Sequence, residues 1–516
     1  MTAPFRTIPD LLSEAAGRDP DGIWIRTDDG TLTFAGAAAR VRLTAGALAG
    51  AGVRRGDLVL VTARTTAPYL LCWLALASLG AVMVAANPRS APAELAGLAH
   101  QTRPRALISD AGLAALIAEA GIAGGLELGV LDAGELTAGW PGTPARAGGP
   151  APAAAAGPDD VAVLIPTSGT TGRSKLVQQT HRAYTLAGEG FPFWMGLTSE
   201  DRLMTSLPLF HINAPAYSVM GSLACGAGLI LLPRFSASTF LDSARQHGAT
   251  EFNAIGAMLE ILMRQPERPD DADTPLRLCY TGPAPARERQ EEIERRFGLR
   301  IVVGYAMSES PYGLIWPRGS RPYGTLGTVR QHPTLGTINE ARIIDEEGND
   351  LPPGETGELL LRNPVITPGY WGMPEETAQV ITPEGWLHTG DLITRDAGGV
   401  YTFVARKKEV LRRRGENLSP AEVEEAVASH PSVLECAVVG VPSELSEDEV
   451  KAFVVPAPDA TPDFGELRAH AAGLLAAYKV PRYWELIAEL PRTPTARVAK
   501  HRLPQERTSA EWDAEA

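Results

Sequence analysis

Along the first 90 residues of the chain, the spacing of apolar positions switches between the spacing of a helix and that of a buried strand. Residues 34–51 carry small apolar side chains at helical spacing, and residues 57–62 are a short apolar run typical of a buried strand. Gly80 divides the apolar stretch 69–86 into a buried helix and a buried strand. We prefer this interpretation to a membrane span, which needs about 20 continuous apolar residues. Such alternation predicts parallel sheets covered by helices.

The pattern changes twice further along. Residues 138–160 are rich in Pro, Gly and Ala, which predicts a surface linker. From about residue 340, short apolar runs between tight turns predict antiparallel strands. Beyond them we expect a separate α+β domain with helices at 419–430 and 464–477 and strands at 433–441, 451–455 and 483–490. Its first helix is expected to be capped by Ser419, with Glu422 completing a capping box. The fold class is α/β, with a large N-terminal domain of helix-covered sheets plus a β-subdomain, and a small C-terminal α+β domain.

Composition narrows the function classes. A chain of 516 residues is expected to form more than one domain. A net charge of −14 argues against a general nucleic-acid surface, because phosphate contacts need basic patches. The four cysteines are far apart and lack C-x-x-C spacing, so we expect buried thiols in a reducing compartment rather than disulfides or a zinc site. The N-terminus lacks an apolar signal core, which favours a cytoplasmic protein.

Residues 164–176 carry the most informative chemistry, reading Leu-Ile-Pro-Thr-Ser-Gly-Thr-Thr-Gly-Arg-Ser-Lys-Leu. Glycines let backbone N–H groups approach an anion, hydroxyls add donors and a lysine adds charge, so the loop is suited to phosphates. It is not a Walker A loop, because that spacing is absent. A polar surface turn is the alternative, but such turns rarely need so many hydroxyls and glycines. The phosphate-binding candidates are Thr167, Ser168, Gly169, Thr170, Thr171, Gly172 and Lys175.

Two further turns follow apolar strands, where α/β sheets bind nucleotides. Gly282-Pro283-Ala284 separates the strand at 276–280 from a helix at 286–296. After the strand at 300–303 comes Gly304-Tyr-Ala-Met-Ser-Glu. Here Tyr305 can stack on adenine, Ser308 can donate to a phosphate, and Glu309 is a hard oxygen ligand suited to Mg²⁺. Each stretch alone also fits an ordinary strand–turn.

The segment Gly385-Trp-Leu-His-Thr-Gly-Asp-Leu places Asp391 at the end of an expected loop, where it can accept hydrogen bonds from both ribose hydroxyls. Together with the phosphate loop, the 304–310 stretch and residues 401–424, it resembles the ordered motifs of the AMP-forming adenylate-forming superfamily. That group comprises acyl-CoA synthetases, peptide-synthetase adenylation domains and luciferases. The resemblance extends over nearly the whole chain and is similar in texture to crotonobetaine/carnitine-type CoA ligases. Ser174 and Leu176 depart from the usual Pro and Gly of the phosphate loop.

The resemblance implies roles for individual residues. It implies ATP with Mg²⁺ held by Glu309 and Thr170, and adenine lying against Gly282, Pro283 and Ala284. It also implies Arg406 at ribose or phosphate, Lys408 as the hinge, Gly415 along the pantetheine tunnel of CoA, and His211 as an aromatic gate of the acyl pocket. A purely structural role for His211 is supported about as well as the role of an aromatic gate. The implied domains are 1–405 for adenylation, 406–410 for the hinge and 411–516 for a mobile C-terminal domain.

The C-terminal motif departs from the family pattern, because Arg497 stands where the family has its catalytic lysine. A planar guanidinium is not equivalent to a compact ammonium. Lys500 lies three residues further on, and it could substitute in a helical turn but would point to the opposite face of a strand. Arg497 and Lys500 are both carried as catalytic candidates.

The leading hypothesis is an ATP-dependent, AMP-forming ligase that joins a small carboxylic acid, with aromatic acids among the candidates, to CoA. One alternative is a diazotase-type enzyme of secondary metabolism that adenylates nitrite and diazotises an aromatic amine. Another is a non-catalytic nucleotide-binding relic, against which the retained Lys175, Glu309, Asp391 and Arg406 argue. The expected partner is a small-molecule acid, without nucleic acid or a membrane span, and a homodimer is allowed.

Overall fold

The computed structural model describes residues 5–137, 140, 156–167, 174–282, 285–413, 416–442, 448–492 and 498–515. By its packing the chain divides into two compact units. Unit 1 comprises Met1–Ala341 and Leu361–Leu387, and unit 2 comprises Arg342–Leu360 and His388–Ala516. The hinge expected at 406–410 lies within unit 2, and the domain boundaries derived from the sequence stay a prediction.

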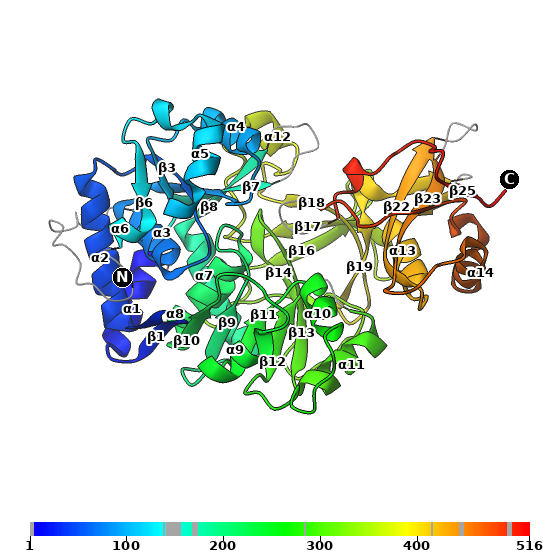
Figure 1. Cartoon of the computed structure of the whole chain (residues 1–516), viewed down its shortest axis with the longest axis horizontal. Coiled ribbons are helices and arrows are strands. Elements are labelled where there is room, and N and C mark those ends of the chain that lie inside the picture. The colour runs from blue at the N-terminus through cyan, green and yellow to red at the C-terminus, as the bar shows by residue number, and fades with distance from the viewer. Residues whose placement is uncertain are drawn as a thin grey trace. The chain divides into compact units, whose positions relative to one another are not determined.

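Unit 1 is built on two mostly parallel sheets, which confirms the expected fold class (Figure 1). Within the described residues the larger sheet has the strand order β15-β14-β13-β12-β11-β9-β10-β1-β2, and the smaller β6-β5-β3-β4-β7-β8. The strands of the larger sheet are β1 (Ile23–Thr27), β2 (Gly30–Thr33), β9 (Arg202–Thr205), β10 (Gly228–Leu231), β11 (Glu251–Asn253), β12 (Leu278–Thr281), β13 (Arg300–Met307), β14 (Ser310–Ile315) and β15 (Thr328–Val329). Those of the smaller sheet are β3 (Leu58–Thr62), β4 (Val82–Ala86), β5 (Ala106–Ser109), β6 (Val130–Asp132), β7 (Val161–Thr167) and β8 (Lys175–Thr180).

Helices cover both sheets of unit 1. They are α1 (Ile8–Arg18), α2 (Phe34–Gly50), α3 (Ala67–Leu79), α4 (Pro92–Thr102), α5 (Ala114–Ala120), α6 (Ala133–Leu136), α7 (His181–Met195), α8 (Met220–Cys225), α9 (Phe240–His247), α10 (Gly256–Met263), α11 (Arg287–Phe297) and α12 (Pro374–Ala378). A π-helical turn, η3 (Ala214–Val219), precedes α8.

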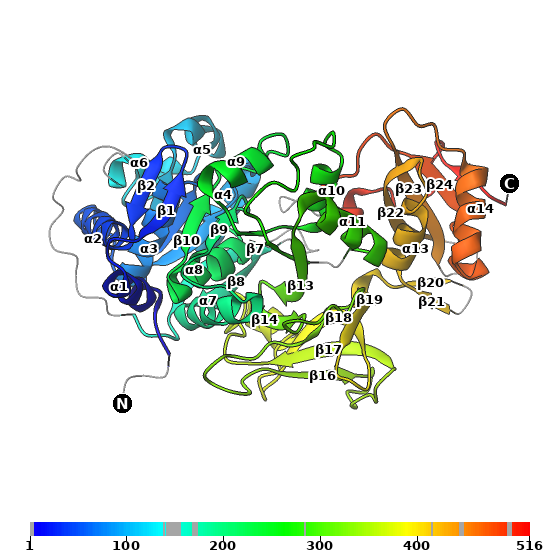
Figure 2. The same ribbon diagram turned by 90° about the horizontal axis from the view of Figure 1, so that it is seen from below.

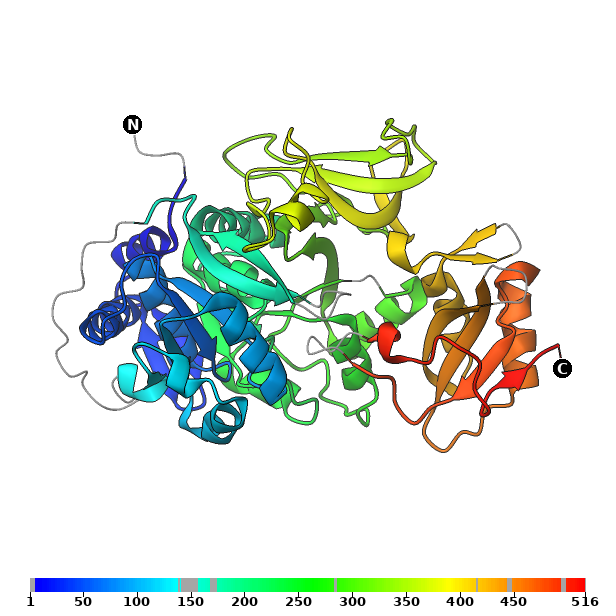
Figure 3. The same ribbon diagram turned by 90° about the horizontal axis from the view of Figure 1, so that it is seen from above.

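Alternation along the strands explains how the smaller sheet is buried on both faces. In β3, Val59 and Val61 belong to the large core that also contains α3 and α7, whereas Leu60 faces a second cluster with Leu95 and Leu98 of α4. Successive side chains of a strand point to opposite faces, so both faces of this sheet need helical cover. The blue-to-cyan part of Figure 3 shows the smaller sheet with its helices.

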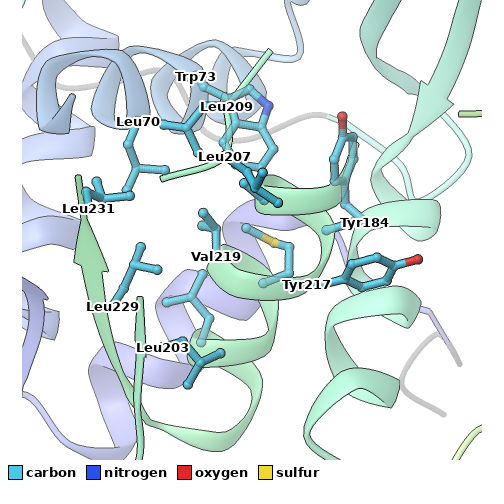
Figure 4. Packing of buried hydrophobic residues seen from close by; sticks show 14 of the residues in the cluster. Leu70, Trp73, Tyr184, Leu203, Leu207, Leu209, Tyr217, Val219, Leu229 and Leu231 are labelled. Carbon is cyan, nitrogen blue, oxygen red and sulfur yellow. The ribbon is translucent and has the colours of Figure 1, made fainter. Parts of the chain in front are cut away.

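The large core joins helices to the strands of the larger sheet. Figure 4 shows Leu70 and Trp73 of α3 near Leu207 and Leu209, with Val219 of η3 beneath them. Trp73 is fully buried and packs edge-on against Tyr184 of α7, with ring centroids 5.3 Å apart. Truncating so large a buried aromatic side chain typically costs about 3–5 kcal/mol, because it also leaves a cavity in the core.

The apolar stretch 69–86 is a helix followed by a strand, as expected. Helix α3 ends at Leu79, and Gly80 takes a left-handed conformation with φ 66° before β4 begins. This conformation favours glycine, because a Cβ would be strained there. None of the described helices is both long and apolar enough for a membrane crossing.

Unit 2 contains antiparallel strands and a small α+β layer (Figure 2). The strands are β16 (Glu340–Ile344), β17 (Thr356–Arg362), β18 (Leu387–Arg395), β19 (Tyr401–Arg406), β20 (Leu411–Arg413), β21 (Glu416–Leu418), β22 (Val433–Pro442), β23 (Asp448–Pro456), β24 (Tyr483–Leu486) and β25 (Trp512–Asp513), the ends of β16, β17 and β18 extending into unit 1. Helices α13 (Pro420–Ala428) and α14 (Phe464–Leu474) pack on one face of the β22–β25 sheet. The two helices and three strands expected in the C-terminal part are present with small shifts of their ends, whereas β20, β21 and β25 were not predicted.

Two expectations need correction, and a third falls mostly outside the described residues. Ser419 is the N-cap residue of α13 but makes no side-chain cap; its hydroxyl donates to the carbonyl of Val404 at 2.9 Å, and Glu422 pairs with Lys479 at 2.6 Å. A tertiary hydrogen bond therefore replaces the capping box. All four cysteines are free, but Cys225 and Cys436 are only partly buried, unlike Cys72 and Cys279. Most of the expected linker, 138–139 and 141–155, lies outside the described residues.

Candidate active site

The expected phosphate loop connects two paired strands of unit 1. Strands β7 and β8 are antiparallel, and Thr167 at the end of β7 pairs with Lys175 at the start of β8. The Thr167 hydroxyl donates to the Lys175 carbonyl at 3.3 Å. Ser168, Gly169, Thr170, Thr171 and Gly172 lie outside the described residues, so their roles stay predictions. What the structure provides is a loop whose two ends are held side by side.

A segment from a distant part of the sequence runs along β8. The Trp371 N–H donates to the Leu176 carbonyl at 2.8 Å, the Gln178 N–H donates to Gly369 at 3.1 Å, and Tyr370 forms a bridge with Val177. The Thr367 hydroxyl adds a bond to the Gln178 carbonyl at 2.6 Å. These bonds bring Tyr370 to Lys175, the last residue of the expected phosphate loop.

Tyr370 connects Lys175 to Glu309. The Lys175 Nζ lies over the Tyr370 ring, 4.6 Å from its centroid, and the Tyr370 hydroxyl donates to Glu309 Oε1 at 2.9 Å. Burial and the neighbouring Glu309 both raise the pKa of Tyr370, so its hydroxyl keeps its proton and remains a donor. The sequence motifs did not single out Tyr370. Its only signal is the Gly-Tyr-Trp run at 369–371, which does not reveal partners about 60 and 195 residues away.

The turn that carries Glu309 is fixed by its backbone. Strand β13 extends through Tyr305 to Met307 and pairs with β14, so Ser308 and Glu309 form the connecting turn rather than a longer loop after residue 303. The Gln179 amide donates to the Ser308 carbonyl, and the Thr367 N–H donates to the Glu309 carbonyl at 2.8 Å. The loop ends, the Ser308–Glu309 turn and the 367–371 segment thus converge.

Neither Lys175 nor Glu309 has an oppositely charged partner within 4 Å among the residues that the structure describes. Their shared neighbour is the neutral Tyr370. In the same part of the chain no group of three His, Cys, Asp or Glu side chains could hold a metal ion. Mg²⁺ is commonly held by one or two carboxylates plus substrate phosphates, so a single placed carboxylate beside a phosphate loop fits that ion.

Glycines allow close packing around the expected adenine turn. A Cβ on Gly282 would lie 2.5 Å from the Gly304 carbonyl oxygen, and a Cβ on Gly313 would lie 2.9 Å from the Tyr305 ring. Side chains at these positions would displace the backbone that precedes and carries Tyr305. Pro283 and Ala284 lie outside the described residues. His211 follows β9 and contacts Phe210, with ring centroids 4.5 Å apart, which tests neither its gate role nor its structural role.

In unit 2, Asp391 and Arg406 form a pair. Asp391 is 1% exposed, and its Oδ1 lies 2.7 Å from Arg406 Nε. The expected loop position of Asp391 is wrong: it sits inside β18, directly opposite Arg406 of β19. The alternating burial of β18 explains why, since residues 387, 389, 391 and 393 all point inward.

A second charged group lies beside this pair. Glu358 Oε2 is 3.1 Å from Lys407 Nζ and 3.4 Å from His388 Nδ1, and Glu358 Oε1 accepts from the Gly390 N–H at 3.1 Å. Burial opposes ionisation of Glu358, but its hydrogen bonds with Lys407 and His388 outweigh burial and lower its pKa. Glu358 therefore holds the Gly390 N–H, which immediately precedes Asp391, and the side chain of Lys407, which immediately precedes Lys408. The side chains of Lys408 and Arg412, and all of Gly415, are outside the described set.

The two catalytic candidates of unit 2 differ in what the structure shows. Arg497 lies outside the described residues. Lys500 begins a 3₁₀ turn, η6 (Lys500–Arg502), and its Nζ is 2.8 Å from Glu424 and 3.5 Å from Glu409. This turn begins at Lys500, after Val498 has formed an isolated bridge with Arg492, so whether Lys500 can take the place of Arg497 stays a prediction. Arg413, which is also in unit 2, is buried in an ion pair with Glu449 at 2.6 Å.

Two family models match the chain. The model described as AMP-binding enzyme matches residues 12–371, and the model described as AMP-binding enzyme C-terminal domain matches residues 422–497. Among curated relatives, a crotonobetaine/carnitine–CoA ligase from Salmonella enteritidis is 30% identical over 492 residues, which cover 92% of this chain and 93% of the relative.

Solved structures agree with these matches. The anthranilate CoA ligase AuaEII in complex with anthranoyl-AMP is similar with a TM-score of 0.86 and 25% identity, covering 97% of this chain and 96% of that one. The o-succinylbenzoate coenzyme A synthetase of Bacillus subtilis in complex with ATP and magnesium ion has a TM-score of 0.84 and 27% identity, with 96% and 98% covered.

Proposed function

The chain belongs to the AMP-binding enzyme family, and from this premise we propose that it is an ATP-dependent, AMP-forming acid–thiol ligase that adenylates a small carboxylic acid and transfers the acyl group to CoA. The relatives and solved structures matched above are acyl- and aryl-CoA ligases. The single observation that carries the proposal is the Lys175–Tyr370–Glu309 arrangement, which holds a cation and a carboxylate on either side of one tyrosine.

We assign the phosphates of ATP to the Thr167–Lys175 loop, in which Lys175 supplies a charge that no described carboxylate neutralises. Glu309, with Thr170, would hold Mg²⁺. When bound, the ion offsets the negative charge of the phosphates. Tyr370 keeps the Glu309 carboxylate oriented by donating to one of its oxygens, which leaves the other for the metal.

For the nucleoside we assign Tyr305, Gly282, Pro283 and Ala284 to adenine, Ser308 to a phosphate, and Asp391 with Arg406 to ribose. The Asp391–Arg406 pair supports the ribose assignment, because a buried carboxylate group can accept hydrogen bonds from hydroxyl groups. Gly415 would lie along the CoA tunnel and His211 at the acyl pocket.

The cation that stabilises charge developing between carboxylate and α-phosphate is assigned to Arg497 or Lys500. Arg497→Ala and Lys500→Ala separate the two. Loss of adenylation with retained transfer from a supplied adenylate identifies the residue that acts, and we expect about a hundred- to a thousand-fold lower rate. Lys500 must first leave Glu424 and Glu409, so we favour Arg497.

The experiment that tests the function measures pyrophosphate release with ATP, Mg²⁺ and a panel of aromatic and aliphatic acids, followed by thioester formation with CoA. Glu309→Gln should abolish release, whereas Glu384→Gln, an exposed carboxylate, should not. Release that needs nitrite and an aromatic amine instead would replace this proposal with the diazotase alternative, which no relative matched above supports. ATP binding without release under any condition would leave a nucleotide-binding relic.

A further inference from the structure

A buried glutamine links the strand that follows the phosphate loop to the turn that carries Glu309. Gln179 lies in β8 and is fully buried, and its side-chain amide donates to the Ser308 carbonyl. Lys175 begins the same strand. Side chains four residues apart in a strand share a face and lie about 13 Å apart. Strand β8 therefore carries the phosphate-binding lysine at one end and a contact to the Glu309 turn near the other.

Two consecutive carbonyl groups of this turn are held from outside. The Ser308 carbonyl accepts from the Gln179 amide. The Glu309 carbonyl accepts from the Thr367 N–H at 2.8 Å. These carbonyls belong to the two peptide groups that meet at the Glu309 Cα. Because a peptide group is planar and rigid, holding both of them fixes the backbone dihedrals of Glu309 and the direction in which its side chain leaves the backbone.

Thr367 is itself tied to β8. Its side chain is buried, and its hydroxyl donates to the Gln178 carbonyl at 2.6 Å. Both bonds that hold the turn therefore originate from β8, one directly through Gln179 and the other through Thr367. The Tyr370 hydroxyl, on a segment bonded to the same strand, then holds one carboxylate oxygen of Glu309.

The Gln179 side chain is costly to bury. Its Oε1 has no hydrogen-bond partner among the residues that the structure describes, and a buried polar atom without a partner costs free energy. An apolar side chain of similar size would avoid that cost. Gln290 of α11 is a matched case, because it is also fully buried and its Oε1 also lacks a described partner. The Gln290 amide, however, donates to Glu294 of its own helix at 3.1 Å.

We propose that Gln179 and Thr367 are positioning residues that set the direction of the Glu309 carboxylate relative to Lys175. This rests on the proposed function and deepens it, since it names the residues that prepare the Mg²⁺ ligand before the ion binds. Neither of the two touches a ligand. Lys175 and Glu309 are only partly buried, and they make the contacts with phosphate and metal.

Calorimetry of ATP binding, with Mg²⁺ and with EDTA and without any acid, tests this in the absence of turnover. The wild type should gain ATP affinity from Mg²⁺. Gln179→Leu should reduce this gain about tenfold, as is typical when a group that orients a metal ligand is removed. Its affinity in EDTA should stay close to that of the wild type, because Lys175 is unchanged. Gln290→Leu is the matched control and should keep the full gain.

Thr367 provides a second pair of variants, which carries the test should Gln179→Leu fail to fold. Thr367→Val loses the hydroxyl and should show the same reduced gain, whereas Thr367→Ser keeps the hydroxyl and should retain the gain. Hydrogen exchange of the ligand-free protein adds a readout independent of ATP. The Thr367 amide donates to the Glu309 carbonyl, so it should exchange faster in Gln179→Leu than in Gln290→Leu.

The outcomes separate this proposal from the ligase function. A full Mg²⁺-dependent gain in Gln179→Leu or Thr367→Val overturns the positioning role and leaves the ligase function standing. The same is true when Gln179→Leu and Gln290→Leu lose equal amounts of the gain, or when urea unfolding shows that the loss of gain follows a general loss of stability. A wild-type protein that binds no ATP with Mg²⁺ overturns the ligase function, and this proposal with it.

Discussion

At the scale of single residues, Tyr370 performs two tasks with one side chain. Its ring lies against the Lys175 ammonium, and its hydroxyl binds the Glu309 carboxylate. A neutral spacer keeps the cation and the carboxylate from neutralising each other. Each charge therefore remains available for a ligand of the opposite sign, which under the proposed function is phosphate for Lys175 and Mg²⁺ for Glu309.

Tyr370→Phe should keep the ring under Lys175 but lose the hydrogen bond to Glu309. A hydrogen bond to a charged group contributes about 1.5–3 kcal/mol, and part of this should appear as weaker metal binding. We expect the Mg²⁺ concentration for half-maximal pyrophosphate release to rise about tenfold, which is roughly 1.4 kcal/mol. Tyr312→Phe serves as the matched control, because it removes another buried tyrosine hydroxyl, one that has no partner among the described residues. An unchanged Mg²⁺ dependence would show that Tyr370 does not orient Glu309.

His181 predicts a pH effect on stability. It is buried at the start of α7, where its Nδ1 accepts from the Ile8 N–H at 3.3 Å, and burial lowers its pKa to about 4. Between pH 6.5 and 4 the unfolded chain binds a proton that the folded chain does not, so stability falls as pH falls through this window. The full loss is about 3 kcal/mol, since one pKa unit is roughly 1.4 kcal/mol.

Urea unfolding of the wild type and of His181→Gln at pH 7.5 and pH 5 measures this effect. Glutamine keeps an acceptor for Ile8 but does not titrate, so the variant should lose less stability between the two pH values. His100→Gln, at an exposed position, should behave as the wild type. Identical pH dependence of wild type and His181→Gln would contradict the assignment.

At the scale of elements, the sequence predicted what depends on local pattern. Gly80 separates α3 from β4 because a left-handed residue ends the helix, and that signal is local. The position of Asp391 was wrong because its turn-forming neighbours suggested a loop, while pairing of β18 with β19 decided the structure. Ser419 was misassigned as a side-chain cap for a similar reason, since a bond to Val404 prevailed. Tyr370 could not be found, because its partners Lys175 and Glu309 are far away in sequence.

Strand β25 is held by buried charge. Lys451 of β23 is fully buried, and its Nζ lies 2.8 Å from both Glu485 of β24 and Glu511, which immediately precedes β25. Lys451→Met would remove the cation that these two carboxylates share, leaving Glu511 with Arg507 at 2.9 Å and Glu485 with the Thr508 hydroxyl. Breaking such a group typically costs about 3–5 kcal/mol.

Hydrogen exchange of the backbone amides of β23 and β24 should be faster in Lys451→Met, by an amount that corresponds to this loss of stability. Lys479→Met is the control, because its pair with Glu422 is at the surface and such pairs contribute about 0–1 kcal/mol. Exchange in Lys451→Met that matches the control would mean that the carboxylates regain partners or protons without cost.

At the scale of the whole molecule, the proposed reaction needs two steps from one chain, adenylation and then transfer to CoA. The candidate residues for these steps lie in both units: Lys175 and Glu309 in unit 1, Asp391 and the Arg497–Lys500 region in unit 2. The family-model matches leave residues 372–421 between them, and Lys408 falls in this interval. The expected hinge is therefore the feature that the two-step scheme most depends on.

Lys408→Pro tests this hinge. Lys408 is the central residue of a 3₁₀ turn, η4 (Lys407–Glu409), and proline would restrict its φ to about −65°. If rotation about Lys408 connects the two steps, the variant should be confined to one arrangement. One half-reaction should then slow by at least tenfold while the other changes little. Separate assays of pyrophosphate release and of thioester formation from a supplied adenylate measure this. Lys408→Ala removes the side chain but leaves the backbone free, so it should retain both steps. An equal loss of both half-reactions in Lys408→Pro, or the same selective loss in Lys408→Ala, would mean that backbone rotation at this residue does not connect them.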